Sequence, residues 1–480
     1  MSAVSAPDHV TPSDGIIMAY ARLEERADAD ADAAAELDAS LSLGAIARAS
    51  LPAILNNVAA PLAAAAQLSC VGFSFAAATP TVAAYAATNA VITFVASVAN
   101  FVIVVTMAKA GHALGARRWD ELWLTVLSAL AAATAVGAAC ALALWLLRQR
   151  VLDALALQTA DEARQASAYW PYAVLRLPPL LLLRAASGAL VGFQHLGVAS
   201  ALNALAAAAD ALAFFALLVT AAAGLPAAGA AVAATSALAA VAAVALVLAL
   251  PPEAARAELR RCRCTGVPAA STVELGCASF DVLLRSVLLS GSVLSLTFAV
   301  APLGPAALAA HAVLLQLWMV ASYAADGLAD VGTMLGSRLL GAGQTARMRT
   351  LTRHLAALGV AGGVGLALLL AAGREAIIRA FTRDEASIAL LAAAWPLLCA
   401  VTPVNAIVFV YDGLLYATQS FKFIRNALAL GVGLIFAPAL ALVVSVHHTL
   451  LAVWMAKVAL NVWRCSTALF RIHGQLWKSW

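Results

Sequence analysis

Residues 170–194 read WPYAVLRLPPLLLLRAASGALVGFQ, and residues 395–419 read WPLLCAVTPVNAIVFVYDGLLYATQ. A Trp-Pro pair, a second proline, a glycine and a final glutamine recur in the two stretches, each displaced by 225 positions. Both stretches are mainly apolar, lack the period-two alternation of a half-buried strand, and are long enough to cross a bilayer as helices. They predict a membrane protein built from two similar halves.

The composition of the whole chain agrees with this prediction. Of its 480 residues, 64% are hydrophobic and 11% are charged, and the mean hydropathy is +0.92. A soluble domain is closer to half apolar and a quarter charged, so a water-soluble fold is excluded. Helices satisfy their own backbone in lipid, and the apolar stretches lack the alternation of a membrane barrel. Apolar stretches bounded by polar residues, Gly or Pro predict twelve transmembrane helices, near residues 43–73, 80–108, 120–147, 166–190, 196–219, 225–250, 271–300, 306–340, 351–373, 388–418, 423–446 and 449–470.

The longest polar connection within the membrane region divides these helices into two sets of six. Because each half has an even number of spans, the two copies share one orientation, related by an axis along the membrane normal. The expected fold class is therefore an all-α integral membrane protein with two six-helix lobes related by a parallel internal repeat. Such a duplication leaves a cavity between the lobes and permits alternating access by rocking. The expected parts are a disordered acidic tail (1–40), an N-terminal lobe (41–250), a basic cytoplasmic linker (251–270), a C-terminal lobe (271–472) and a cytoplasmic tail (473–480).

Loop charges indicate the orientation of the bundle. On one side of the membrane the predicted loops are rich in Lys and Arg, whereas the loops on the other side are uncharged or balanced by acids. By the positive-inside rule, both termini are expected to be cytoplasmic. The net charge of +4 does not indicate a nucleic-acid partner, and seven scattered cysteines do not form a disulfide framework. The basic set comprises Lys109, Arg117, Arg118, Arg256, Arg260, Arg261, Arg263, Arg338, Arg347, Arg349, Arg353, Lys422, Arg425, Arg464, Arg471 and Lys478.

Ionisable residues inside the predicted spans point to a functional site in the second half, because charges at membrane depth are costly and call for a partner, water or a function. Asp326 and Asp330 lie one helical turn apart, and Asp412 lies in the tenth span. We expect Asp326 and Asp412 to couple transport to a cation, since a carboxylate in a solvated pocket can exchange protons. The alternative is that these aspartates only neutralise Arg285 or bind backbone groups. The expected partner or cavity residues are Arg285, Asp330, Tyr323, Asn405 and Tyr411.

The first half contains fewer charges in equivalent places. The repeat aligns Ser187 with Asp412 and Asn100 with Asp326. We expect Gln67, Asn100 and Asp210 to line the cavity of the N-terminal lobe, although Asp210 can instead pair with an arginine of the fourth span, Arg176 or Arg184.

These residues resemble the multidrug and toxic compound extrusion (MATE) family, and in particular its DNA-damage-inducible F type branch, over roughly residues 43–470. The resemblance implies a two-lobed, twelve-helix antiporter that expels organic compounds against an inward flow of protons or sodium. Similar branches occur in plastid-bearing eukaryotes. The segments that carry the resemblance are Leu284-Arg285-Ser286, Ala309-Ala310-His311-Ala312-Val313-Leu314, Ser322-Tyr323-Ala324-Ala325-Asp326-Gly327-Leu328-Ala329, Pro403-Val404-Asn405-Ala406 and Tyr411-Asp412-Gly413.

The first half departs from this branch. Where the resemblance implies an aspartate in the first span, the chain has Gln67, which cannot titrate. Asp210 falls near a position where the branch has asparagine, and Phe214 falls near one where it has aspartate. A coupling route through the N-terminal lobe is therefore not expected to match that of the branch.

The sequence thus predicts a secondary antiporter for small organic molecules, driven by H⁺ or Na⁺, without a bound cofactor or metal. We expect a monomer in a lipid bilayer, in the plasma membrane or an organelle envelope such as that of a plastid. Two alternatives stay open: a flippase for lipid-linked precursors with the same two-lobed architecture, and an integral membrane enzyme. A flippase would need a more basic cavity for pyrophosphate, and an enzyme would need a metal or nucleophile motif that the sequence does not display.

Overall fold

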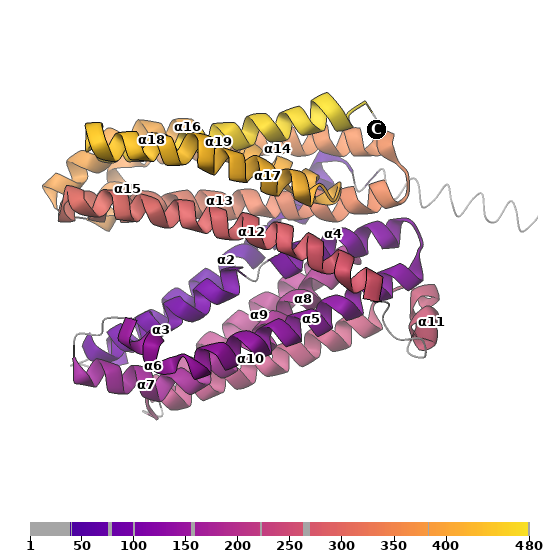
Figure 1. The fold of residues 1–480 in the computed structure, drawn as a ribbon, viewed down its shortest axis with the longest axis horizontal. Helices are drawn as coiled ribbons and strands as arrows, with labels where there is room; N and C mark the ends of the chain where they lie inside the picture. The colour runs from indigo at the N-terminus through magenta and orange to yellow at the C-terminus, as the bar shows by residue number, and fades with distance from the viewer. Residues whose placement is uncertain are drawn as a thin grey trace, which may run out of the picture.

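The computed structural model describes residues 39, 41–74, 79–98, 101–154, 159–220, 223–262, 269–382 and 384–478. Within these ranges the regular structure is helical. Two helical bundles meet at one end and diverge toward the other, so that the molecule has the shape of a V (Figure 1). The predicted acidic tail, apart from residue 39, lies outside the described residues, as do residues 263–268 of the linker and residues 479–480.

The first bundle runs from α2 to α10 and the second from α12 to η5, with α11 (Glu253–Cys262) between them. The elements of the first are α2 (Leu43–Ser74), α3 (Thr79–Val98), α4 (Phe101–Gly115), α5 (Trp119–Leu146), α6 (Arg148–Ala154), α7 (Ala160–Leu175), α8 (Leu177–Gly192), α9 (Leu196–Phe215), η1 (Ala216–Thr220) and α10 (Gly224–Ala249). Those of the second are α12 (Ala269–Val300), η2 (Ala301–Leu303), α13 (Pro305–Gly341), α14 (Thr345–Ala372), α15 (Arg374–Phe381), α16 (Glu385–Ala417), α17 (Phe421–Gly431), η3 (Val432–Phe436), α18 (Ala437–Leu442), η4 (Val443–His447), α19 (Leu450–Leu469) and η5 (Phe470–Leu476).

The all-α fold and the twelve helices are confirmed. In the described part of the chain, 10 helical stretches are long and apolar enough to span a membrane, and α2 and α19 complete the twelve. Several helices begin before the predicted spans, since α7 starts at Ala160 and α14 at Thr345. Their first turns contain charged residues, because a helix continues beyond the hydrocarbon core into the polar interface. The predicted span 80–108 consists of α3 and α4, and α4 extends to Gly115.

The internal repeat is visible in the backbone of the loops. Gln194 and Gln419, which are 225 positions apart, both have positive φ, at 69° and 54°. Arg117 (φ 55°) and Gly343 (φ 70°) form a second such pair, where only the glycine adopts this conformation without strain. Short helices α6 and α15 precede the repeated stretches in both halves. The recurring glutamines therefore mark equivalent helix ends in two copies of one fold.

The two bundles touch where α4 and α13 cross. A Cβ atom on Gly115, the last residue of α4, would lie 2.0 Å from the carbonyl oxygen of Arg338. A Cβ atom on Gly341, the last residue of α13, would lie 2.0 Å from the carbonyl oxygen of His112. Each half thus presents a glycine to the backbone of the other. The Gln194 side chain adds a hydrogen bond to the Met334 carbonyl at 2.8 Å.

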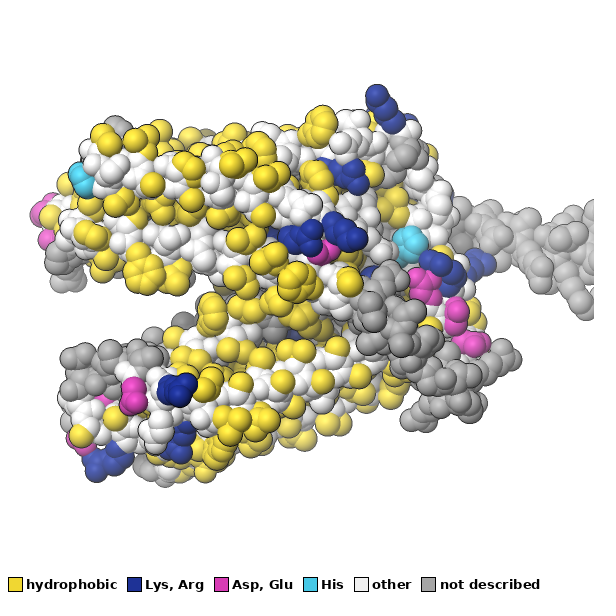
Figure 2. Space-filling view, viewed as in Figure 1, with side chains coloured by type: hydrophobic (Ala, Val, Ile, Leu, Met, Phe, Trp, Pro, Cys, Tyr) yellow, Lys and Arg dark blue, Asp and Glu magenta, His cyan; other side chains and the backbone are white. Residues whose placement is uncertain are grey.

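Helix α2 also joins the bundles. It packs against α9 of its own lobe and against α13 of the other lobe. Gly327 of α13 faces Ile54 of α2, where a Cβ atom would lie 2.9 Å from the Ile54 backbone nitrogen. Just before α2, the buried Leu41 has its carbonyl oxygen 2.7 Å from Nδ1 of His354 on α14. The V is therefore closed at the end that contains Leu41, Gly115 and Gly341, and the lobes separate at the opposite end (Figure 2).

The glycine crossing yields a first prediction. Gly341→Ala places a methyl group against rigid backbone, so we expect the closed end to separate and the lobes to move apart there. Pulsed electron resonance between spin labels on exposed Asp120 and Ala346, in a cysteine-free background, should show a longer distance. Gly362→Ala in α14 is the matched control, because nothing lies within 4 Å of its Cβ position. An unchanged distance distribution for Gly341→Ala would mean that the crossing does not hold the lobes together.

Candidate functional site

The C-terminal lobe contains a buried carboxylate held by two arginines. Asp412 of α16 is 6% exposed and accepts hydrogen bonds from Arg285 of α12 and from Arg464 of α19. The Arg464 Nη2 to Asp412 Oδ2 distance is 2.7 Å. Two guanidinium groups supply the countercharge and hydrogen bonds that a buried carboxylate needs. The expected link between Arg285 and Asp412 is present, and it ties three helices together.

A chain of amides extends this ion cluster through the lobe. Arg464 donates to Asn461 Oδ1 at 3.3 Å, and Asn461 donates to Asn405 Oδ1 at 2.8 Å. Asn405 in turn donates to the Ser322 hydroxyl of α13 at 3.0 Å. Asn405 and Asp412 lie two turns apart on α16, so they share one face of that helix. We call Arg285, Asp412, Arg464, Asn461, Asn405 and Ser322 the C-lobe polar chain.

Asp326 and Asp330 lie on α13 at the interface with the first lobe. Asp330 Oδ2 accepts a hydrogen bond from Asn57 of α2 at 3.2 Å, which crosses between the lobes. Among the described residues, Asp326 forms neither a hydrogen bond nor an ion pair, and its side chain is partly accessible. It interacts electrostatically with Asp330, Arg285 and Asp412. The structure therefore groups the two predicted coupling carboxylates, but it leaves only Asp326 without a direct partner.

The remaining expected residues of this lobe have different surroundings. Tyr323 is half-buried near Asp326. Tyr411 is 2.7 Å from Nε2 of His473 at the C-terminal end of the chain, and so its hydroxyl does not join the ion cluster. Asp281 lies four residues before Arg285 on α12, a spacing that allows local pairing, but the two side chains do not pair. Asp281 binds Arg425 of α17 instead, because α17 packs on this part of α12.

Arg464 is the main residue that sequence reasoning placed incorrectly. The loop-charge pattern groups it with the basic loops, whereas it is 8% exposed inside α19. The predicted span 449–470 contains it, together with the buried Lys457 and Asn461. These three polar residues inside an apolar span are the signal that identifies α19 as part of the site.

The N-terminal lobe contains a polar chain without ions. Ser187 donates to Asn203 Oδ1 at 3.0 Å, and Asn203 donates to Asn56 Oδ1 at 2.9 Å. Asn56 donates to Asn57 Oδ1 at 3.2 Å, and Asn57 reaches Asp330 in the other lobe. Ser187 is the repeat equivalent of Asp412. The two lobes thus have polar chains at related places, formed of amides and a hydroxyl in one and of ions and amides in the other.

Two of the three predicted cavity residues of the N-terminal lobe have partners within that lobe. Asp210, 5% exposed, forms an ion pair with Arg176 at 2.5 Å, so Arg176 rather than Arg184 is its partner. Gln67, also 5% exposed, accepts a hydrogen bond from the Tyr85 hydroxyl at 2.9 Å. The Phe214 ring lies 5.3 Å from that of Tyr85. Asn100 lies outside the described residues.

The structure also limits what can bind at the ion cluster. A cavity of about 20 Å³ adjoins Arg285, Asp412 and Arg464, which is room for about one water molecule. Within the described ranges, no three His, Cys, Asp or Glu side chains form a group that can hold a metal ion. The cavity beside the cluster is therefore smaller than an organic substrate.

The MatE family model matches residues 52–206 and 282–442 of the chain, one segment in each lobe. Protein DETOXIFICATION 42 of Arabidopsis thaliana is 28% identical over 170 residues, which cover 34% of this chain and 33% of that protein. Protein DETOXIFICATION 44, chloroplastic, of the same plant is 30% identical over 120 residues, covering 25% of this chain and 23% of the relative. The chain thus matches a third or less of the length of these curated relatives.

A solved structure extends the likeness to nearly the whole fold. The Vibrio cholerae MATE transporter VcmN in its bent form has a TM-score of 0.79 to this chain, at 17% sequence identity. The similar region covers 92% of this chain and 98% of VcmN. At 17% identity the similarity to VcmN establishes the fold alone. The family model covers more than half of the chain and therefore establishes family membership. Assignment to the DNA-damage-inducible F type branch stays a prediction. The chain belongs to the MatE family, the multidrug and toxic compound extrusion family that its sequence resembles.

Proposed function

We propose that the chain is a secondary active antiporter that exports small organic molecules in exchange for protons or sodium ions by alternating access. Family membership supports export, and the V shape corresponds to a state with one side open and the other closed. With both termini cytoplasmic, as the loop charges predict, the open side faces away from the cytoplasm. A plasma membrane or a plastid envelope is the proposed location, and one relative is described as chloroplastic.

The observation that carries the proposal is the position of Asp326. This carboxylate lies at the interface of the lobes, lacks a direct partner among the described residues, and is partly accessible. It is one turn from Asp330, which bonds across the interface to Asn57. A proton or sodium ion on Asp326 would remove repulsion between the two aspartates and so alter the balance between open and closed states.

Asp412 has a different part in this proposal. Its Oδ2 atom already accepts from two arginines, so losing its charge would leave both arginines without a countercharge. We assign it the role of holding α12, α16 and α19 together and setting the positive potential beside Asp326. In this proposal, Asp326 is therefore the one aspartate of the two that exchanges the coupling ion.

Transport itself can be tested with the purified chain in proteoliposomes. Efflux of a fluorescent organic cation should require an opposing proton or sodium gradient, and substituting one gradient for the other identifies the ion. Dye movement that ignores both gradients would contradict antiport.

The role of Asp326 can be separated from that of its neighbour. Asp326→Asn cannot exchange a proton, so we expect gradient-driven dye efflux to fall to the level of empty liposomes. Asp330→Asn keeps an amide oxygen that accepts from Asn57 but removes the charge that repels Asp326, so it should weaken the response to the gradient without abolishing it. Asp161→Asn, at an exposed ion pair with Arg164, is the control that should keep the full response. Gradient-driven efflux at the unmodified rate in Asp326→Asn would show that the coupling site is elsewhere.

The role of Asp412 can be measured as stability. Asp412→Asn leaves two buried arginines without a countercharge, and we expect it to lower the free energy of unfolding by about 3–5 kcal/mol. The measurement is the Tm of the purified protein in detergent. Adding Arg464→Gln should restore part of the loss by removing one unpaired charge. Asp161→Asn breaks an exposed pair with Arg164 and should leave the Tm nearly unchanged. A Tm for Asp412→Asn equal to that of the unmodified protein would contradict this role.

A further inference from the structure

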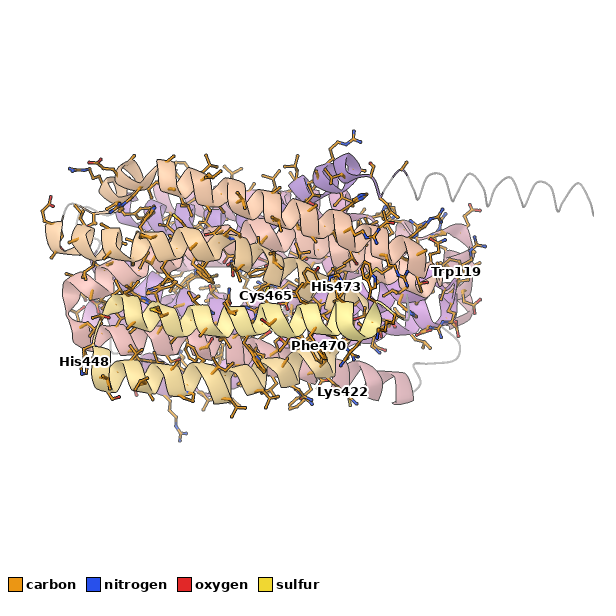
Figure 3. The ribbon with its side chains drawn as sticks, turned by 90° about the horizontal axis from the view of Figure 1, so that it is seen from above. Trp119, Lys422, His448, Cys465, Phe470 and His473 are labelled. Atoms are coloured by element: carbon orange, nitrogen blue, oxygen red, sulfur yellow. The ribbon has the colours of Figure 1, made fainter. Side chains whose placement is uncertain are left out.

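A groove in the C-terminal lobe lies between α12 and α17 and shares no lining residue with the cavity at the ion cluster. Helices α12 and α17 pack side by side and leave a space of about 370 Å³ between them. Gly276 opens this space, because nothing lies within 4 Å of its Cβ position. Figure 3 shows Lys422 at the edge of the molecule, at the end of α17 beside α12. The lining residues, which we call the α12–α17 groove, are Gly276, Cys277, Phe280, Asp281, Lys422 and Arg425.

The two basic side chains of the groove differ in whether an acidic group neutralises them. Asp281, 4% exposed, binds the Arg425 guanidinium, which also donates to Asn426 Oδ1 at 3.0 and 2.9 Å. Arg425 is thereby fixed in place. Lys422 is exposed and forms no ion pair in the described part of the chain. The groove has one unneutralised positive charge, and Figure 2 shows Lys and Arg side chains gathered over this part of the lobe.

The candidate span Phe421–Val446 begins beside the groove, on the side of the molecule at which the lobes are closed. The end of a transmembrane span lies near the level where a bilayer changes from hydrocarbon to headgroups. An exposed apolar face continues from the groove along both helices toward the middle of the membrane. On α12 it comprises Phe280 (57% exposed), Val287, Leu294 and Phe298, and on α17 and η3 it includes Leu430 and Leu434 (71%).

We propose that the α12–α17 groove binds the phosphate headgroup of an anionic phospholipid, with its acyl chains along the apolar face of α12. Lys422 supplies the mobile cation and Arg425 the fixed donors, both of which suit phosphate oxygens. Basic pockets between transmembrane helices near the interface are sites of this kind. The adjoining apolar face favours a lipid over free phosphate, because only a lipid covers it.

The experiment measures bound lipid rather than transport, so it is independent of the proposed antiport. The full chain is purified in detergent with either phosphatidylglycerol or phosphatidylcholine, and retained lipid is counted by native mass spectrometry. We expect phosphatidylglycerol to be retained in preference. Lys422→Gln should weaken this retention about fivefold, the effect of one basic side chain beside an anionic surface. Lys422→Arg should preserve it, and Lys478→Gln, an exposed lysine outside the groove, should have no effect.

A second measurement locates the lipid. Cys277 is exposed in the groove, whereas Cys140, Cys399 and Cys465 are half-buried. Phosphatidylglycerol should slow alkylation of Cys277 by a water-soluble maleimide, and inorganic phosphate should not. Equal retention of the two lipids, or equal retention by Lys422→Gln and the unmodified chain, would overturn the proposal. Protection of Cys277 by phosphate alone would show a free-anion site instead.

Discussion

The two lobes meet closely at the crossing of α4 and α13, where each helix presents a glycine to the backbone of the other. No larger residue fits at Gly115 or Gly341 without displacing a carbonyl group. The interface around this crossing holds the hydrogen bonds of Gln194 and Asp330. Because packed interfaces switch between discrete arrangements, this contact is either made as a whole or broken as a whole. The V shape follows from closure at this one end.

Much of the fold could be predicted from the sequence because its signals are local or periodic. Long apolar stretches indicate helices in lipid, and the 225-residue register identifies the duplication before any contact is known. The structure explains why the glutamines recur, since Gln194 and Gln419 both adopt positive φ at equivalent helix ends. Helix boundaries were less accurate, because α7 and α14 continue into the polar interface, where hydropathy gives no signal.

The site was only partly predictable. Asp412 and Arg285 stood out as charges at membrane depth, but which residues pair depends on how each helix is rotated about its axis. Asp281 therefore binds Arg425 and not Arg285, four residues away on the same helix. The loop-charge pattern does not distinguish Arg464 from the basic loop residues, although the predicted span 449–470 contains it. In a sequence, an arginine that pairs with a buried carboxylate cannot be distinguished from a loop arginine that orients the protein in the membrane. The helix packing distinguishes them.

The lobes have diverged in chemistry while keeping one backbone plan. Where the second lobe has Asp412 and two arginines, the first has Ser187 and a relay of asparagines. Its remaining carboxylate in this region, Asp210, is paired with Arg176, and Gln67 is bound by Tyr85.

One consequence concerns α2, which packs in the first lobe while the carbonyl of Leu41, just before it, is held by His354 of the second. The lobes cannot separate at the closed end as rigid blocks: either this contact breaks, or α2 bends. Proline residues at positions 52 and 61 cannot donate backbone hydrogen bonds within α2, which makes bending easier in the stretch that contains Asn56 and Asn57. Strain in a single helix would then be transmitted directly to the side chain that contacts Asp330.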